Sequence, residues 1–134
     1  EASQAGVDIQ LVVRGNCSLI TGIEGVSENI QINGIIDRYL EHSRIFVFAS
    51  GGEEKVFIGS ADWMPRNLNN RIEVITPVYD PVIKKEIKHI VEDGFKDTMQ
   101  GRIVDGSGKN LFREEETPFR SQEALYNHYL NENI

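Results

Sequence analysis

Two short apolar runs near the middle of the chain, residues 45–48 and 56–58, lie on either side of the pair Gly51-Gly52. Apolar runs around a glycine turn are typical of a β-hairpin. In an antiparallel pair, the residue before the first strand lies beside the residue after the second. We therefore expect the polar clusters that flank this hairpin to share one end of the sheet.

The first part of the chain also predicts strands. Residues 7–13 form a nearly continuous apolar run, which is typical of an internal strand buried on both faces. Arg14 follows directly, and this placement predicts a charged side chain at the carboxyl edge of the sheet, where open α/β sheets bind ligands. Residues 16–29 are rich in Gly, Ser and Asn and indicate a loop. Residues 30–33 are expected to be extended, whereas 35–40 fit a strand or a helix.

The second half contains the strongest helical pattern. Apolar residues recur every three or four positions between Pro81 and Met99, which predicts an amphipathic helix. Asp80 is the expected N-cap and Pro81 the first helical residue. Lys84, Lys85 and Lys88 fall largely off the apolar stripe and are expected on a solvated face.

Weaker patterns complete the predicted fold. We expect a loop around Met64-Pro65, strands at 71–78 and 102–104, and a last helix capped by Ser121. Residues 1–6 resemble the end of a helix with Gly6 as its C-terminal cap, as in an excised domain. The order of elements predicts an α/β fold in which a mixed sheet is flanked by helices.

Composition limits the classes of function. A chain of 134 residues is expected to form a single domain, and its net charge of −7 argues against nucleic-acid binding. Arg14, Arg44 and Arg66 concentrate positive charge near the expected sheet edge, as a confined phosphate site would. The single cysteine, Cys17, excludes an internal disulfide and favours a cytoplasmic setting.

The clusters flanking the hairpin carry the candidate chemistry. His42-Ser43-Arg44 precedes the first run, and Gly59-Ser60-Ala61-Asp62-Trp63 follows the second. Imidazole both gives and takes a proton near neutral pH, and a guanidinium matches the oxygens of a phosphate. Ser60 and Asp62 are candidates to orient His42 or a backbone amide. Periodicity alone leaves open a histidine bonded only to backbone.

Neighbouring residues have structural alternatives. Arg66 can pair with Glu73 or Asp62, and Trp63 is expected in the core. His89 and His128 have no clustered partner in the sequence and are expected to be ordinary surface or half-buried residues.

His42-x-Arg44 and Gly59-Ser60-Ala61-Asp62 resemble a half-site of the phospholipase D superfamily, HxKxxxxD followed by Gly-Ser-x-Asn. The chain departs from that pattern at three positions: Arg44 replaces the lysine, Ala49 the aspartate and Asp62 the asparagine. The superfamily combines two histidine half-sites, and this chain contains one.

A more specific resemblance is to the last catalytic-core domain of type-1 polyphosphate kinases, which keep a degenerate phospholipase D-like fold. It is carried by Val13-Arg-Gly15, Tyr39-Leu-Glu-His-Ser-Arg44 and Ile58-Gly-Ser-Ala-Asp-Trp-Met-Pro-Arg-Asn67, and it extends over essentially the whole chain. It implies that Arg14 contacts nucleotide phosphate, that His42 is the second active-site histidine and that Arg44 binds a phosphoryl oxygen.

The same resemblance implies a reaction in which ATP transfers its terminal phosphoryl group reversibly to inorganic polyphosphate. The phosphorylated histidine is then expected in a preceding domain, and the Mg²⁺ ligands outside this chain. The full-length enzyme is expected to be a homo-oligomer in the cytoplasm, with peripheral membrane association left open. Two alternatives remain: a homodimeric phosphodiesterase, disfavoured by the three departures, and a non-catalytic polyphosphate-binding module.

Overall fold

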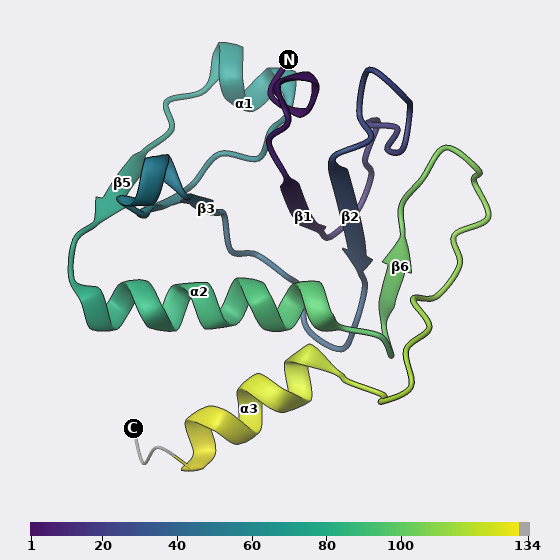
Figure 1. The fold of residues 1–134 in the computed structure, drawn as a ribbon. Helices are drawn as coiled ribbons and strands as arrows, with labels where there is room; N and C mark the ends of the chain where they lie inside the picture. The colour runs from purple at the N-terminus through teal and green to yellow at the C-terminus, as the bar shows by residue number, and fades with distance from the viewer. Residues whose placement is uncertain (132–134) are drawn as a thin grey trace. The chain divides into compact units, whose positions relative to one another are not determined.

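The computed structural model describes residues 1–131 and confirms an α/β fold with mixed strand directions, flanked by helices (Figure 1). The strands form two three-stranded sheets, whereas the sequence predicted one. Contacts divide the chain into two compact units, the first made of residues 1–41 with the chain from Glu92 onward, the second of His42–Val91. That the chain is a single domain stays a prediction.

The first unit contains strands β1, β2 and β6 and helix α3, with these bounds: Ile9–Val13, Ile30–Ile35, Gly101–Ile103 and Ser121–Asn131. The second contains strands β3, β4 and β5 and helix α1: Ile45–Phe48, Lys55–Gly59, Ile75–Val78 and Pro65–Asn70. Helix α2, Pro81–Lys96, begins in the second unit and ends in the first.

The sheet of the first unit has the strand order β1-β2-β6 (Figure 1). β1 pairs in parallel with β2, and β6 pairs antiparallel to β2. The prediction that residues 7–13 form an internal strand is therefore wrong for the described chain, in which β2 is central and β1 lies at the edge. An apolar run reports burial of side chains, but not how many neighbours the backbone has.

A buried asparagine joins β2 to the end of α2. Asn33 Nδ2 donates to the carbonyls of Gly94, Phe95 and Asp97 at 3.0, 3.3 and 3.1 Å. These carbonyls lie at and just after the end of α2, where a helix runs short of backbone donors. Gly101 lies against this amide so closely that a Cβ would overlap it. The close approach of β6 to the helix end therefore requires glycine.

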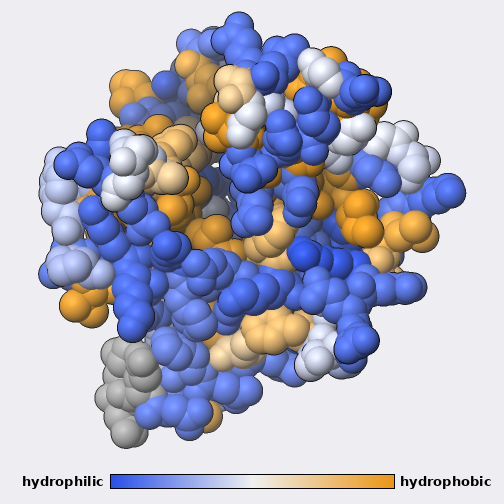
Figure 2. Space-filling view, viewed as in Figure 1, coloured by the Kyte–Doolittle hydropathy of each residue, from blue (hydrophilic) through white to orange (hydrophobic). Residues whose placement is uncertain are grey.

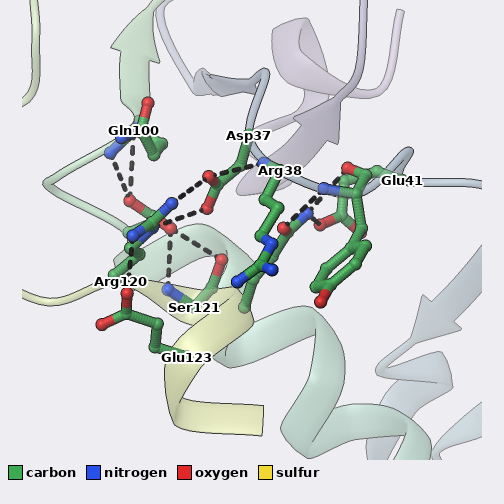
Figure 3. Close-up of polar contacts among 11 residues, drawn as sticks. Asp37, Arg38, Glu41, Gln100, Arg120, Ser121 and Glu123 are labelled. Atoms are coloured by element: carbon green, nitrogen blue, oxygen red, sulfur yellow. Dashed lines mark hydrogen bonds and ion pairs between the residues drawn. The ribbon is translucent and has the colours of Figure 1, made fainter. Parts of the chain in front are cut away.

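Asp97 follows α2 and is fully buried, at 0% exposure. Its Oδ1 accepts from the N–H groups of Gln100 and Gly101 at 2.7 and 3.2 Å, and its Oδ2 accepts from the N–H and hydroxyl of Ser121, both at 2.7 Å (Figure 3). The helix predicted to run to Met99 therefore ends at Lys96. Ser121 is not a cap as predicted: its hydroxyl donates to Asp97, and Asp97 accepts from the helix amide.

The start of α3 also holds the segment that follows β2. Arg120 donates to both carboxylate oxygens of Asp37 at 2.6 and 3.0 Å, and this hydrogen bonding holds the pKa of Asp37 below its usual value (Figure 3). Gln122 accepts from the N–H of Tyr39 and donates to its carbonyl, both at 2.9 Å. Of the residues whose conformation the sequence left open, Ile35 ends β2 and the segment after it is irregular.

The second unit confirms the predicted hairpin. β3 and β4 pair antiparallel with Ile45 opposite Ile58, and β5 adds a third antiparallel strand on β4. Gly51 and Gly52 have φ values of +65° and +101°, which favour glycine in the turn. α1 occupies the segment around Met64-Pro65, where the sequence predicted a loop, and β5 is shorter than the predicted 71–78.

Helix α2 begins as predicted, because Asp80 Oδ1 accepts from the N–H groups of Val82 and Ile83 at 2.8 and 3.1 Å. Two of the lysines expected on a solvated face also bond to the hairpin turn. Lys84 donates to the carbonyl of Glu54 at 3.1 Å, and Lys88 pairs with its carboxylate at 2.7 Å. These bonds connect α2 to the hairpin turn.

Few large apolar side chains are fully buried. Among the described residues, Ile35 and Val56 fall in that class and Ile32 is 6% exposed, while Ile72 is 100% exposed. Apolar side chains are accordingly visible on the surface (Figure 2). Buried polar bonds are therefore a large part of what orders the first unit.

Replacing Asp97 by asparagine should lower the free energy of unfolding by about 2 kcal/mol. The amide group keeps the volume but sets an NH₂ against buried N–H or O–H donors. Urea unfolding of the chain measures the change, with the exposed Asp8→Asn as the matched control. Equal stability of the two variants would contradict the role of Asp97.

Candidate functional site

The hairpin brings the two polar clusters together, as predicted. The N–H of Gly59, at the end of β4, donates to the carbonyl of Arg44 at 2.9 Å, which extends the β3–β4 pairing by one residue. His42 therefore lies at the same end of the second unit as Ser60 and Asp62.

Arg44 connects His42 to Asp62. Its Nε and one terminal nitrogen lie 3.1 and 3.0 Å from Asp62 Oδ1. The other terminal nitrogen lies 2.6 Å from the carbonyl oxygen of His42, and 2.9 and 3.1 Å from the ring nitrogens Nδ1 and Nε2. We call these three residues the arginine bridge. It places the guanidinium directly against the imidazole.

Ser60 takes part in a second group. Its hydroxyl accepts from the N–H of Val74 at 3.0 Å and donates to Glu73, whose other carboxylate oxygen accepts from Asn67 Nδ2 at 2.8 Å. The hydrogen bond from Ser60, followed by that from Asn67, holds the pKa of Glu73 below its usual value of 4.5. Glu73 is thus a carboxylate at neutral pH. Of the two partners that the sequence suggested for Ser60, the structure shows a backbone amide, that of Val74, and not His42.

An open pocket of about 780 Å³ lies over both groups and is formed by residues of the second unit. Its polar lining combines cationic and hydrogen-bonding side chains with one carboxylate, and its remaining wall is largely isoleucine. The polar lining residues with long side chains are His42, Arg44, Asn67, Arg71 and Glu73. Such a lining can receive an anionic group together with an uncharged one.

Sequence reasoning missed Arg71 and Asn67 as lining residues and considered Glu73 only as a partner for Arg66. The predicted strand 71–78 concealed Arg71 and Glu73, since β5 begins only at Ile75, and Asn67 lies on α1, where the sequence predicted a loop. The available signal was the pair of charged residues on either side of Ile72, which lies just before a strand. It is comparable to the position of Arg14 just after a strand.

Two other predictions need correction. Trp63 is 70% exposed and stacks on Phe46 with ring centroids 5.7 Å apart, so it is not a core residue. Arg66 is exposed on α1, while Glu73 and Asp62 bond to other side chains. The turn after β4 points the tryptophan outward, which its hydrophobicity alone does not reveal.

Arg14 lies in the first unit, immediately after β1, and is half-buried. Its position at the carboxyl end of a strand agrees with the sequence. Its proximity to His42 stays a prediction. His89 and His128 are half-buried on α2 and α3, as expected, and the His128 ring packs edge-on against Tyr129.

Within residues 1–131, no group of three or more His, Cys, Asp or Glu side chains is arranged to hold a metal ion. No helix in this part of the chain has the length and apolar character needed to span a bilayer.

Comparisons with known proteins agree on one family. Residues 1–122 match the family described as Polyphosphate kinase C-terminal domain 2. The chain is 45% identical over 129 residues to a polyphosphate kinase of Escherichia coli K12, and 48% identical over 132 residues to one of Vibrio vulnificus YJ016. These matches include 95% and 97% of this chain, and 19% of each relative.

A solved structure supports the same grouping. The crystal structure of polyphosphate kinase from Porphyromonas gingivalis matches with a TM-score of 0.92 and 45% identity, over 98% of this chain and 20% of that one. The chain thus spans about a fifth of the length of the relatives it matches.

Replacing Ser60 by alanine should raise the pKa of Glu73 toward 4.5, because the charged carboxylate loses its strongest donor. A lowered pKa means that ionised Glu73 stabilises the folded chain above pH 4.5 and that this contribution is lost as the pH falls below it. The variant should therefore lose less folding stability when Glu73 becomes protonated at low pH. A ¹³C-carboxyl NMR titration measures the pKa, with Ser43→Ala as the control. An unchanged Glu73 titration would contradict the assignment.

Proposed function

This chain belongs to the Polyphosphate kinase C-terminal domain 2 family, and we propose that it supplies one half of the active site of a polyphosphate kinase. The full-length enzyme would transfer the terminal phosphoryl group of ATP to inorganic polyphosphate, reversibly. The observation that carries the proposal is the arginine bridge at the edge of the pocket, where His42 and a guanidinium lie in direct contact.

Phosphoryl transfer needs positioned positive charge more than covalent chemistry from the protein. The transferred group carries its charge on three oxygens, and guanidiniums match such oxygens with fixed pairs of donors. Arg44 would stabilise this charge, and Arg71 in the same lining can bind a neighbouring phosphate. Arg14 would hold nucleotide phosphate oxygens, as the resemblance implies.

The nucleophile belongs to another domain in this proposal. A histidine nitrogen there attacks the γ-phosphorus of ATP, the new P–N bond forms, and the bond to the β,γ-bridging oxygen breaks to release ADP. In the second step a terminal oxygen of polyphosphate attacks the same phosphorus, and the P–N bond breaks. His42 would donate a proton to, or accept one from, the attacking or leaving phosphate oxygen or the nucleophilic histidine ring.

The charge distribution of the chain fits a polyanionic substrate that contacts the protein over a short length only. The net charge is −7, but the pocket wall combines Arg44 and Arg71 with His42. A polyphosphate chain would therefore be attracted at the pocket and repelled elsewhere on the acidic surface. Ionised Glu73 next to the cations would disfavour a misplaced phosphate.

The remaining expectations belong to the same proposal. They are a phospholipase D-like fold, preceding domains of the same polypeptide as partners, a homo-oligomeric full-length enzyme and a cytoplasmic setting. Mg²⁺ would shield the phosphates, with its protein ligands expected outside this chain.

Replacing His42 by alanine in the full-length enzyme should lower ATP-dependent polyphosphate synthesis by about 10²- to 10⁴-fold, the range of a positioned acid or base. Thermal unfolding should stay unchanged, because His42 is exposed. His89→Ala, outside the pocket lining, is the control and should keep normal turnover. Near-normal turnover of the His42 variant would refute the catalytic role.

The 134-residue chain alone should not synthesise polyphosphate, because the proposed nucleophile lies in another domain. Incubation with ATP, Mg²⁺ and a polyphosphate primer, followed by gel analysis of polymer length, tests this expectation. The full-length enzyme provides the positive control. Polymer growth by the isolated chain would contradict the division of the active site.

A further inference from the structure

We propose that Asp62 is a positioning residue that fixes Arg44 and, through Arg44, the ring of His42. This inference rests on the proposed function and adds a role for a side chain that itself stays outside the pocket. Among the described residues, the pocket lining includes His42 and Arg44 but not Asp62.

The geometry of the arginine bridge assigns different tasks to the two sides of the guanidinium. Nε and one terminal nitrogen both point to a single oxygen of Asp62, at 3.1 and 3.0 Å. Only the other terminal nitrogen contacts His42. The carboxylate therefore determines which edge of the guanidinium is presented to the imidazole and the pocket.

Asp62 is itself firmly placed. Its carbonyl accepts from the N–H of Met64 at 2.7 Å, Ala61 before it is buried, and Trp63 after it stacks on Phe46. The Gly59-to-Arg44 backbone bond fixes the other end of the ion pair. Both partners are thus held by the hairpin before the side chains meet, so little order has to be gained when a substrate binds.

The bridge also constrains the imidazole. A guanidinium carries only donors, so the ring nitrogen that bonds to it must present its lone pair. One terminal nitrogen of Arg44 lies within reach of both ring nitrogens, so the contact holds the imidazole against the guanidinium whichever nitrogen accepts. Without Asp62 the guanidinium keeps its bond to the carbonyl of His42 but loses the partner on its other side, and the phosphate-binding edge and the imidazole are less firmly directed.

A purely stabilising ion pair is the competing explanation. The side chains of Arg44 and Asp62 are only 14% and 27% exposed, so removing one partner can lower stability as well as turnover. The two explanations differ in what the variant loses: a stabilising pair affects unfolding, whereas a positioning pair affects turnover.

The test uses the full-length enzyme with Asp62→Asn, Asp62→Glu, Arg44→Lys and the double variant Asp62→Asn with Arg44→Lys. Asp62→Asn should lower kcat by about 10- to 100-fold with little change in the KM for ATP, as expected for lost positioning. Asp62→Glu, which keeps the charge, should recover most of the turnover. Glu53→Gln, in the hairpin turn, is the control carboxylate.

The double variant distinguishes an effect through Arg44 from an independent one. Arg44→Lys should retain measurable turnover, and adding Asp62→Asn to it should lower kcat by less than about twofold, because the fork that Asp62 orients is already lost. An equal loss in both backgrounds, or an Asp62→Glu variant no better than Asp62→Asn, would overturn the inference.

The outcomes also separate this inference from the proposed function. Normal kcat in Asp62→Asn together with inactive His42→Ala would overturn the role of Asp62 alone. Normal activity of both His42→Ala and Arg44→Lys would refute the proposed function itself. A loss of activity in Asp62→Asn that follows a lowered melting temperature, without rescue by glutamate, would support the purely stabilising explanation.

Discussion

The order of the first unit depends on the buried carboxylate of Asp97. An ion removed from water is costly unless donors replace its hydration, and four donors from two segments do so here. Because these donors come from the residues before and within β6 and from the first residue of α3, one side chain fixes where α2 ends, where β6 starts and where α3 begins. Asn33 completes the arrangement from β2 by pairing the carbonyls at the end of α2.

In this unit, polar hydrogen bonds therefore supply much of the order that a larger apolar core supplies in other proteins. Hydrophobic burial has no direction, whereas each of these hydrogen bonds specifies one partner and one geometry. The ion pair between Asp37 and Arg120 extends the same principle to the segment after β2. The chain that leads toward the candidate site is thus fixed by specific pairs up to Glu41, which accepts from Gln122 at 2.7 Å.

The second unit uses charge in a different setting. Two residues of the arginine bridge line an open pocket, and the pair of Arg44 with Asp62 is largely shielded from solvent. The bridge supplies direction: a guanidinium with one side on a carboxylate presents its other side to an imidazole. Ser60 and Asn67 direct Glu73 in a similar way and keep it ionised. This combination of fixed donors and one carboxylate fits the handling of phosphoryl groups.

The local elements and the chemistry at one end of the hairpin could be predicted from the residues alone. The Gly51-Gly52 turn, the Asp80-Pro81 helix start and the position of His42 and Arg44 beside Asp62 follow from interactions between residues near in sequence or paired across a tight hairpin. The packed chain was needed to show that β1 is an edge strand, that Ser121 bonds to Asp97 from 24 residues away, and that Arg71 and Glu73 face the pocket. Such contacts depend on how separate elements pack, and no periodicity in the sequence records which distant donor meets which acceptor.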